Sequence, residues 1–333
     1  MRQYVRVALS LVLALSATVL AQAERVRADV PVDQTEPAAL VAPGPAAEVG
    51  PMRHVWQMWN NCGPASVTMA LDALGVDVTQ EEARLALRGP DIRVGMPAGN
   101  VGPWVSEKFG LRTVWRTGGT ADQIKLFVAN GFSVLVTQWL EDPPSRIAHY
   151  RVVRGYDDAR QAFLVNDPMR GANVALGYGW FDENWQAFLY RYLVIYRPED
   201  EPKVRAIVGD DWDDVRMRER MYLRARDDAA RDGTSPAWLA YGEAAYQYGL
   251  FGEAVAAYER GLVLGSPAGV FTARTSYPHA LRLLGRSEEA DAALRKLTGI
   301  TSGPVRTSGP DALAVALAEH RARMAEHYAQ RAE

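Results

Sequence analysis

The sequence predicts an α+β domain followed by an all-α repeat region. In the first half, segments with apolar residues at helical spacing come first, and apolar segments of strand length follow them. In the last third, the chain matches itself at an offset of 36 residues. The chain has 333 residues, 48% of them hydrophobic and 23% charged, which suits about two globular domains.

Charge and cysteine content exclude several classes of protein. The 37 Lys and Arg against 40 Asp and Glu give a formal net charge of −3, without the basic excess that nucleic-acid binding needs. A single cysteine excludes an internal disulfide framework and a cysteine-rich zinc site. We therefore expect no nucleic-acid partner, no metal and no organic cofactor.

The N-terminus is typical of a secretory signal over residues 1–23. Arg2 and Arg6 lead into a 15-residue apolar run, and Ala21-Gln22-Ala23 forms an A-x-A cleavage site. The run is shorter than the roughly 20 residues of a membrane-spanning helix. We expect an exported protein (periplasmic, extracellular or associated with the cell envelope) without a membrane span after cleavage; an uncleaved anchor is the alternative. Residues 24–51, rich in Ala, Pro, Val and Gly, predict an extended linker.

The only cysteine, Cys62, lies where a helix is predicted to begin. Apolar residues recur every three or four positions after it, at Val67, Ala70, Leu71 and Leu74. Asn60 or Asn61 can cap the start of this helix, and Gly75 its end. Unpaired N–H groups and the helix dipole favour a thiolate at that position, which a cysteine nucleophile requires. The alternative is that Cys62 is a small buried hydrophobic residue.

Gln57 lies five residues before the cysteine, and His54 lies in the same approach. The side-chain amide of Gln57 can reach back toward the helix start. With the backbone N–H of Cys62 it would form an oxyanion hole of two donors. Gln57 is therefore a candidate for stabilising the transition state.

A predicted hairpin joins a histidine to a carboxylate. His149 opens a strand-like segment that ends at Tyr156, and a second such segment spans 162–168. Folding the chain about residue 159 pairs positions whose numbers sum to about 318, so Asp167 falls beside His149. A carboxylate there can orient the imidazole as the third member of a triad does, although Asp167-Pro168 is also typical of a strand-ending turn.

Four elements, in order, resemble a known family: Gln57, Cys62-Gly63-Pro64-Ala65-Ser66, His149-Tyr150 and Asn166-Asp167-Pro168. They resemble the papain-like bacteriocin-processing (double-glycine leader) cysteine peptidases, and most closely the stand-alone bacterial peptidase-like branch. The resemblance implies a papain-like fold, Cys62 as nucleophile, His149 as acid and base, Asp167 as orienting residue and Gln57 as oxyanion donor. In the transporter-linked members the glutamine more often lies six residues before the cysteine. The chain also has no G-x-x-x-x-G-K-[ST] loop, so cleavage after a double glycine does not follow.

The other elements complete a domain over 52–198. We expect helices at 79–87, 97–109 and 120–130, and strands at 111–115, 133–139 and 189–196. The loop 140–148 directly precedes His149 and can wall or gate a cleft. Of the tryptophans, we expect Trp59 and Trp139 to lie near the site and contact substrate; most of the others are expected to pack in cores.

The C-terminal third, 212–333, is predicted to be a helical repeat after an acidic linker at 199–211. Trp238, Gly242, Ala254 and Tyr258 have the spacing of a tetratricopeptide repeat, which this unit resembles. In a second, degenerate unit Arg274 replaces the tryptophan. Such helix pairs either offer a groove to a protein partner or dock on the preceding domain as a scaffold, and both interpretations stay open.

The sequence therefore predicts a thiol protease that cleaves a peptide or amide bond through an acyl-enzyme, acting on a peptide or protein substrate. A first alternative is a catalytically silent adaptor that keeps the peptidase fold and acts through its repeats. A second keeps the triad but transfers the acyl group to an amine, as in transglutaminase-like or amidase chemistry.

Overall fold

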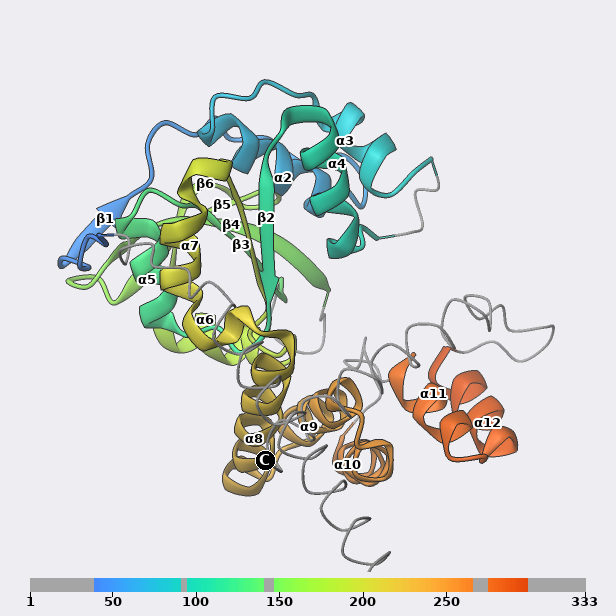
Figure 1. The fold of residues 1–333 in the computed structure, drawn as a ribbon. Helices are drawn as coiled ribbons and strands as arrows, with labels where there is room; N and C mark the ends of the chain where they lie inside the picture. The colour runs from blue at the N-terminus through green and yellow to red at the C-terminus, as the bar shows by residue number, and fades with distance from the viewer. Residues whose placement is uncertain (1–38, 91–94, 141–146, 266–274, 299–333) are drawn as a thin grey trace, which may run out of the picture. The chain divides into compact units, whose positions relative to one another are not determined.

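The computed structural model describes residues 39–90, 95–140, 147–265 and 275–298 (Figure 1). The predicted signal at 1–23 and most of the predicted linker lie outside the described residues. The end of the C-terminal region, 299–333, also lies outside them.

After the short strand β1 (Ala46–Glu48), three helices precede the other strands, as the sequence predicts: α2 (Cys62–Ala73), α3 (Gln80–Leu87) and α4 (Val101–Phe109), the last preceded by the 3-10 turn η1 (Ala98–Asn100). Thr79 caps α3 by accepting the Glu82 backbone N–H. Gly75 follows the last turn of α2 with a φ of +74°, a conformation that glycine adopts without strain.

A seven-stranded antiparallel sheet follows, with the strand order β2-β7-β3-β4-β5-β6 and with β1 paired to β4. The strands are β1 (Ala46–Glu48), β2 (Arg112–Arg116), β3 (Val134–Trp139), β4 (Ala148–Asp157), β5 (Ala162–Asp167), β6 (Gly171–Gly177) and β7 (Tyr192–Tyr196). Helices first and an antiparallel sheet afterwards make an α+β domain, so the predicted fold class is confirmed.

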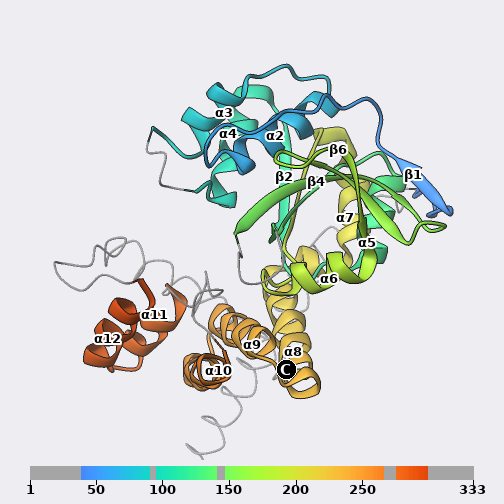
Figure 2. The ribbon, with the colours of Figure 1, turned by 180° about the vertical axis from the view of Figure 1, so that it is seen from behind.

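Helices cover both faces of the sheet (Figures 1 and 2). On one face, Leu71 of α2 packs in a core with Val152 and Leu193 of the sheet. On the other face, α5 (Ala121–Ala129), α6 (Tyr178–Gln186) and α7 (Glu201–Val208) contribute to a second core. The sheet is therefore buried on both sides, and α2 is held firmly at one of its faces.

The predicted hairpin has the predicted register. Val152 pairs with Asn166 and Val153 with Val165, so the paired numbers sum to 318 as expected. A bulge at Arg154 shifts the pairing by one toward the turn. At the open end of the hairpin this register sets Asp167 beside the start of β4, where His149 lies.

The predicted linkers are partly wrong. Residues 199–211 form η2 (Pro198–Asp200), α7 and η3 (Gly209–Trp212), and Val204 and Ile207 are buried in the core. The acidic residues and prolines of this segment suggest a linker, but its apolar residues Val204, Ile207 and Val208 recur at helical spacing. Pro202 lies in the first turn of α7, where proline is tolerated. The end of the 24–51 segment is also structured, because β1 pairs with β4 and Val49 is buried.

The C-terminal region is all-helical in the part that the structure describes. It contains α8 (Asp214–Asp232), α9 (Ser235–Tyr248), α10 (Phe251–Leu264), α11 (Ser276–Leu283) and α12 (Ser287–Thr298). A Cβ on Gly242 would lie 2.8 Å from the Tyr258 ring, so the close approach of α9 and α10 requires glycine there. In the described ranges no helix has both the length and the apolar character to cross a membrane.

Candidate active site

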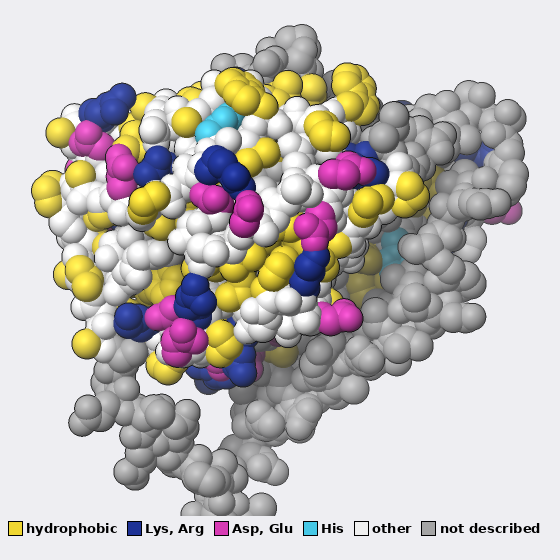
Figure 3. All heavy atoms as spheres, turned by 90° about the horizontal axis from the view of Figure 1, so that it is seen from above, with side chains coloured by type: hydrophobic (Ala, Val, Ile, Leu, Met, Phe, Trp, Pro, Cys, Tyr) yellow, Lys and Arg dark blue, Asp and Glu magenta, His cyan; other side chains and the backbone are white. Residues whose placement is uncertain are grey.

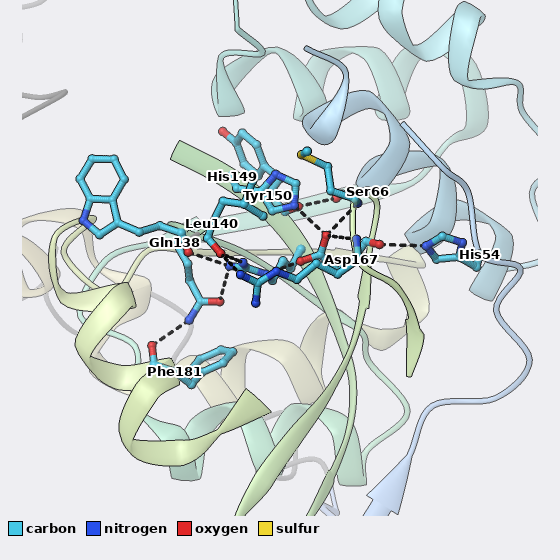
Figure 4. Close-up of polar contacts among 12 residues, drawn as sticks. His54, Ser66, Gln138, Leu140, His149, Tyr150, Asp167 and Phe181 are labelled. Atoms are coloured by element: carbon cyan, nitrogen blue, oxygen red, sulfur yellow. Dashed lines mark hydrogen bonds and ion pairs between the residues drawn. The ribbon is translucent and has the colours of Figure 1, made fainter. Parts of the chain in front are cut away.

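The sheet brings His149 and Asp167 into contact. His149 comes from the start of β4 and Asp167 from the end of β5, and both side chains are buried. The Nε2 of His149 lies 2.9 Å from Oδ1 of Asp167, which is hydrogen-bonding distance (Figure 4). The carboxylate therefore fixes the orientation of the imidazole ring.

Cys62 is the first residue of α2 and is partly exposed. Its thiol hydrogen-bonds the His149 side chain. Because Nε2 of that ring faces Asp167, Nδ1 is the nitrogen left for the thiol. The three side chains thus form one chain of contacts from sulfur to carboxylate, built from a helix start and two neighbouring strands.

The electrostatics favour a thiolate and an imidazolium. Burial raises the pKa of the Cys62 thiol, but the hydrogen bond and the charge of His149 outweigh it and leave the pKa below its ordinary value. Burial lowers the pKa of His149, but its hydrogen bonds to Asp167 and Cys62 raise the pKa above its ordinary value. The two groups stabilise each other's charged form, so they titrate as a pair.

Asp167 has a full set of donors. Its Oδ1 also accepts the backbone N–H groups of Met169 (2.8 Å) and Arg170 (3.0 Å), and its Oδ2 accepts the Nε–H of Arg151 at 2.6 Å. Burial opposes the charge of the carboxylate, but these hydrogen bonds and neighbouring charges hold the pKa of Asp167 far below its usual range. Asp167 therefore stays ionised at neutral pH.

Arg151 is a site residue that the sequence analysis missed. It is completely buried on β4, two residues after His149. Besides Asp167, it donates to Oε1 of Gln138 (3.2 Å) and to two backbone carbonyls, those of Trp139 and Leu140 (3.1 Å each). The strand β3, which carries Gln138 and Trp139, thus fixes the Arg151 guanidinium in contact with the Asp167 carboxylate.

The segment before the cysteine is bound to the Asp167–Pro168 turn. The backbone N–H of Gln57 donates to the Pro168 carbonyl at 2.9 Å. The Nε2 of His54 lies 2.9 Å from the backbone carbonyl of Asp167 (Figure 4). Gln57 therefore lies next to the turn that carries Asp167. Its buried Oε1 has no hydrogen-bond partner among the described residues.

Two side chains at the ends of the α3 segment, those of Gln80 and Arg88, form hydrogen bonds to the loop that precedes Cys62. Gln80 accepts the Met58 N–H (2.6 Å) and donates to the Trp56 carbonyl (2.8 Å). Arg88 donates to the Asn60 carbonyl and to Oδ1 of the buried Asn61, each at 2.5 Å. Asn60 has a φ of +54°, an uncommon conformation that this surrounding network supports. Neither Gln80 nor Arg88 is distinguished as a site residue by the local sequence pattern.

The two tryptophans expected near substrate differ. Trp59 is 80% exposed and lies three residues before Cys62. Trp139 is buried, and its ring packs against Phe188 at 4.7 Å between centroids. The backbone carbonyl of Trp139 accepts a hydrogen bond from Arg151, which in turn contacts Asp167 of the triad. The side chain of Trp139, the last residue of β3, points into the packed interior, so its ring is not available to substrate. Trp139 therefore lies near the site as expected, but its buried ring does not support the expected contact with substrate.

Within the described ranges, no group of three or more His, Cys, Asp or Glu side chains is arranged to hold a metal ion. The described site consists of protein groups suited to acyl transfer: a paired thiol, an oriented imidazole and a helix start with unpaired N–H groups.

Comparisons with known proteins identify the same part of the chain. Residues 49–193 match the model of the Peptidase_C39 like family, and within this segment the chain is similar to that family. The match includes Gln57, Cys62, His149 and Asp167. No curated protein matches the chain.

Three solved structures are similar to part of the chain. A protein from Bacillus anthracis described as a C39-like peptidase has 14% identity and a TM-score of 0.39, covering 46% of this chain and 98% of that chain. A double glycine motif protease from an AMS/PCAT transporter, in complex with the leader peptide, has 19% identity and a TM-score of 0.35, covering 47% and 99%. The peptidase domain of Streptococcus ComA, a bi-functional ABC transporter of a quorum sensing pathway, has 15% identity and a TM-score of 0.36, covering 44% and 99%.

Proposed function

We propose that this protein is a thiol hydrolase that cleaves a peptide or amide bond through Cys62, His149 and Asp167. The observation that carries the proposal is the continuous set of contacts from the partly exposed thiol through the imidazole to the buried carboxylate. Similarity of residues 49–193 to the Peptidase_C39 like family supports the same reaction class.

The geometry supports a two-step acyl transfer. The Cys62 thiolate attacks the carbonyl carbon, and the oxyanion accepts hydrogen bonds from the Cys62 backbone N–H and the Gln57 amide. The His149 imidazolium gives its proton to the leaving amine, and the acyl group remains on sulfur. His149, now neutral, takes a proton from water as the water attacks the thioester, which releases the acid and regenerates the thiolate. Asp167 keeps the ring in place throughout.

Alkylation by iodoacetamide tests the proposal without knowledge of the substrate. Cys62 is the only cysteine, so labelling of the full chain reports on this thiol alone. Because the pKa of Cys62 is lowered, we expect fast labelling at pH ~6, where an ordinary thiol of pKa about 8.5 is nearly inert. The rate is measured by mass spectrometry against free N-acetylcysteine, with His149→Ala as the matched variant.

His149→Ala should bring the labelling rate at pH ~6 close to that of N-acetylcysteine, because the thiolate then loses its cationic partner. Equal, slow labelling of the unchanged chain and the variant would contradict the proposal and favour a silent adaptor. If fast labelling is found, product analysis with an added amine separates hydrolysis from transfer to that amine.

Gln57→Ala tests the oxyanion hole separately. We expect turnover to fall about 10²–10³-fold, because one of two donors to the oxyanion is lost. The labelling rate of Cys62 should not change, since the amide acts on the substrate oxygen and not on sulfur. Gln247→Ala, on α9, is the control. A Gln57 variant with full turnover would remove this residue from the mechanism.

We also propose that the protein is exported through residues 1–23, and that α9–α12 form two tetratricopeptide-like units that offer a groove to a protein partner. The close packing of Gly242 on Tyr258 within the α9–α10 pair supports the first unit. The A-x-A site after a 15-residue apolar run supports export.

A further inference from the structure

Five large apolar side chains are exposed on the segments next to the triad residues in sequence. Trp59 is 80% and Trp56 62% exposed, and the other three are about half exposed. They are Trp56, Met58, Trp59, Ile147 and Met169, and we call them the apolar rim. Exposed apolar side chains scattered singly are ordinary, but a group of this size around one site marks a binding surface.

The rim flanks the nucleophile on two sides. Trp56, Met58 and Trp59 lie in the six residues before Cys62. On the same side, Met169 donates its N–H to Asp167, and a Cβ on Gly171 would lie 3.7 Å from the Trp56 ring. Ile147 lies two residues before His149, and its carbonyl accepts the Leu140 N–H. A chain bound across the thiol therefore meets apolar side chains on both sides.

The loop is built to keep these side chains outside. The polar backbone groups of Trp56, Met58 and Trp59 are bound from below by Gln80 and Arg88. Because these backbone groups have partners within the protein, the loop is fixed, and its apolar side chains point toward solvent without collapsing onto the core. Such preorganisation lowers the entropic cost of binding.

From this surface, we propose that the substrate is an extended or unfolded polypeptide with bulky apolar side chains next to the cleaved bond, held by the apolar rim. This inference rests on the proposed hydrolase function and names its substrate class. Small residues such as a pair of glycines would leave the two tryptophans exposed to water, whereas Leu, Phe or Met side chains would cover them.

The charge pattern favours a polypeptide over a lipid surface. Figure 3 shows the end of the molecule at the top of Figure 1, where hydrophobic side chains gather among basic and acidic side chains that lie in pairs. Arg53, in the same loop segment, is paired with Asp72 and Asp77. Peripheral membrane surfaces instead combine apolar side chains with an excess of Lys and Arg, which this chain of net charge −3 lacks.

The test measures binding to the full chain carrying Cys62→Ala, so that no turnover is needed. Two fluorescein-labelled peptides of equal length and charge are compared by fluorescence anisotropy, one rich in Leu and Phe and one with Ser and Gln at those positions. We expect the apolar peptide to bind at least tenfold more tightly. Adding Trp56→Ala and Trp59→Ala together should weaken it about 10- to 30-fold, as loss of aromatic anchors does.

Leu223→Ala on α8, which removes an exposed apolar side chain outside both the rim and the α9–α12 units, is the matched control and should leave binding unchanged. Circular dichroism, together with the labelling rate of Cys62 in the tryptophan variants that retain this thiol, reports whether the site is intact. If Cys62 is labelled slowly in the chain that retains it but the apolar peptide still binds, the result counts against the proposed hydrolase activity and not against peptide binding by the apolar rim.

Two outcomes overturn the inference whatever the labelling rate. One is equal binding of the two peptides. The other is peptide binding that the tryptophan variants do not change. If those variants then lose binding to phosphatidylcholine vesicles, or lose a concentration-dependent dimer in sedimentation, the tryptophans act on that partner instead.

Discussion

Cys62→Ala is expected to abolish turnover of any peptide that the native chain cleaves, because Cys62 is the only cysteine and no other side chain can form the thioester. His149→Ala is expected to have the same effect, since without the imidazole the thiol is neither charged nor able to pass its proton to the leaving amine. Residual rates in both variants should agree with each other, because residues that act as one unit do not contribute additively. Product formation is followed by mass spectrometry with the apolar peptide.

Both variants should keep the far-ultraviolet circular dichroism of the native chain. Cys62 is small and partly exposed, and it does not belong to either hydrophobic core of the peptidase-like domain. His279→Ala is the control for loss of a histidine, because His279 lies on α11 in the helical region. Turnover that survives in either variant would show that the contacts between thiol and imidazole do not carry the reaction.

Arg151→Met is expected to give the largest loss of stability. The change removes the guanidinium from the buried Asp167 carboxylate and leaves the Trp139 carbonyl and the Gln138 amide oxygen without the Arg151 donors, while the Leu140 carbonyl keeps only its bond from Arg170. Removing one partner of a buried ion pair typically costs about 3–5 kcal/mol. Urea unfolding measures the loss, with Arg231→Met as an exposed ion-pair control that should change stability much less.

The same variant changes the acid response of the fold. A carboxyl group whose pKa is depressed in the folded state contributes stability above its unfolded pKa of about 3.9, and this stability is lost as the pH falls toward the folded pKa. Without Arg151 the depression is smaller, so stability should fall less steeply below pH ~4. Arg151→Lys keeps the positive charge, so the steepness of its loss of stability below pH ~4 should lie between that of the native chain and that of Arg151→Met. Equal stability of Arg151→Met and the native chain would show that the ion pair is dispensable.

Much of the candidate site follows from local patterns. The start of α2 is visible in the spacing of apolar residues, and the turn at 157–161 sets the register that brings His149 to Asp167. Both inferences use neighbours in sequence, for which helical and strand periodicities are strong signals.

The supporting residues are invisible at that level. Arg151 looks like an ordinary polar residue of an alternating strand, and nothing in its neighbours shows that it is buried opposite Asp167. Gln80 begins α3 and Arg88 follows its last residue, and neither position stands out in the sequence from an ordinary solvated side chain. From the sequence, Trp139 is a candidate cleft residue. In the structure its ring is covered by Phe188, which lies 49 positions later in the chain, so no local pattern could show the burial. β6 and α6 were not foreseen either, because 171–186 mixes small, polar and aromatic residues without a clear period.

The dependence of the cysteine loop on α3 bears on protein engineering. A designer who transplanted only the stretch from Gln57 to Ser66 into another scaffold would leave its carbonyls and amides unsupported, and Asn60 would relax out of its left-handed backbone conformation. A unit that keeps the hydrogen bonds of this loop to the α3 segment has to run at least to Arg88. A graft that omits α3 and Arg88 would contain Cys62 but not the hydrogen bonds that fix the loop in front of it.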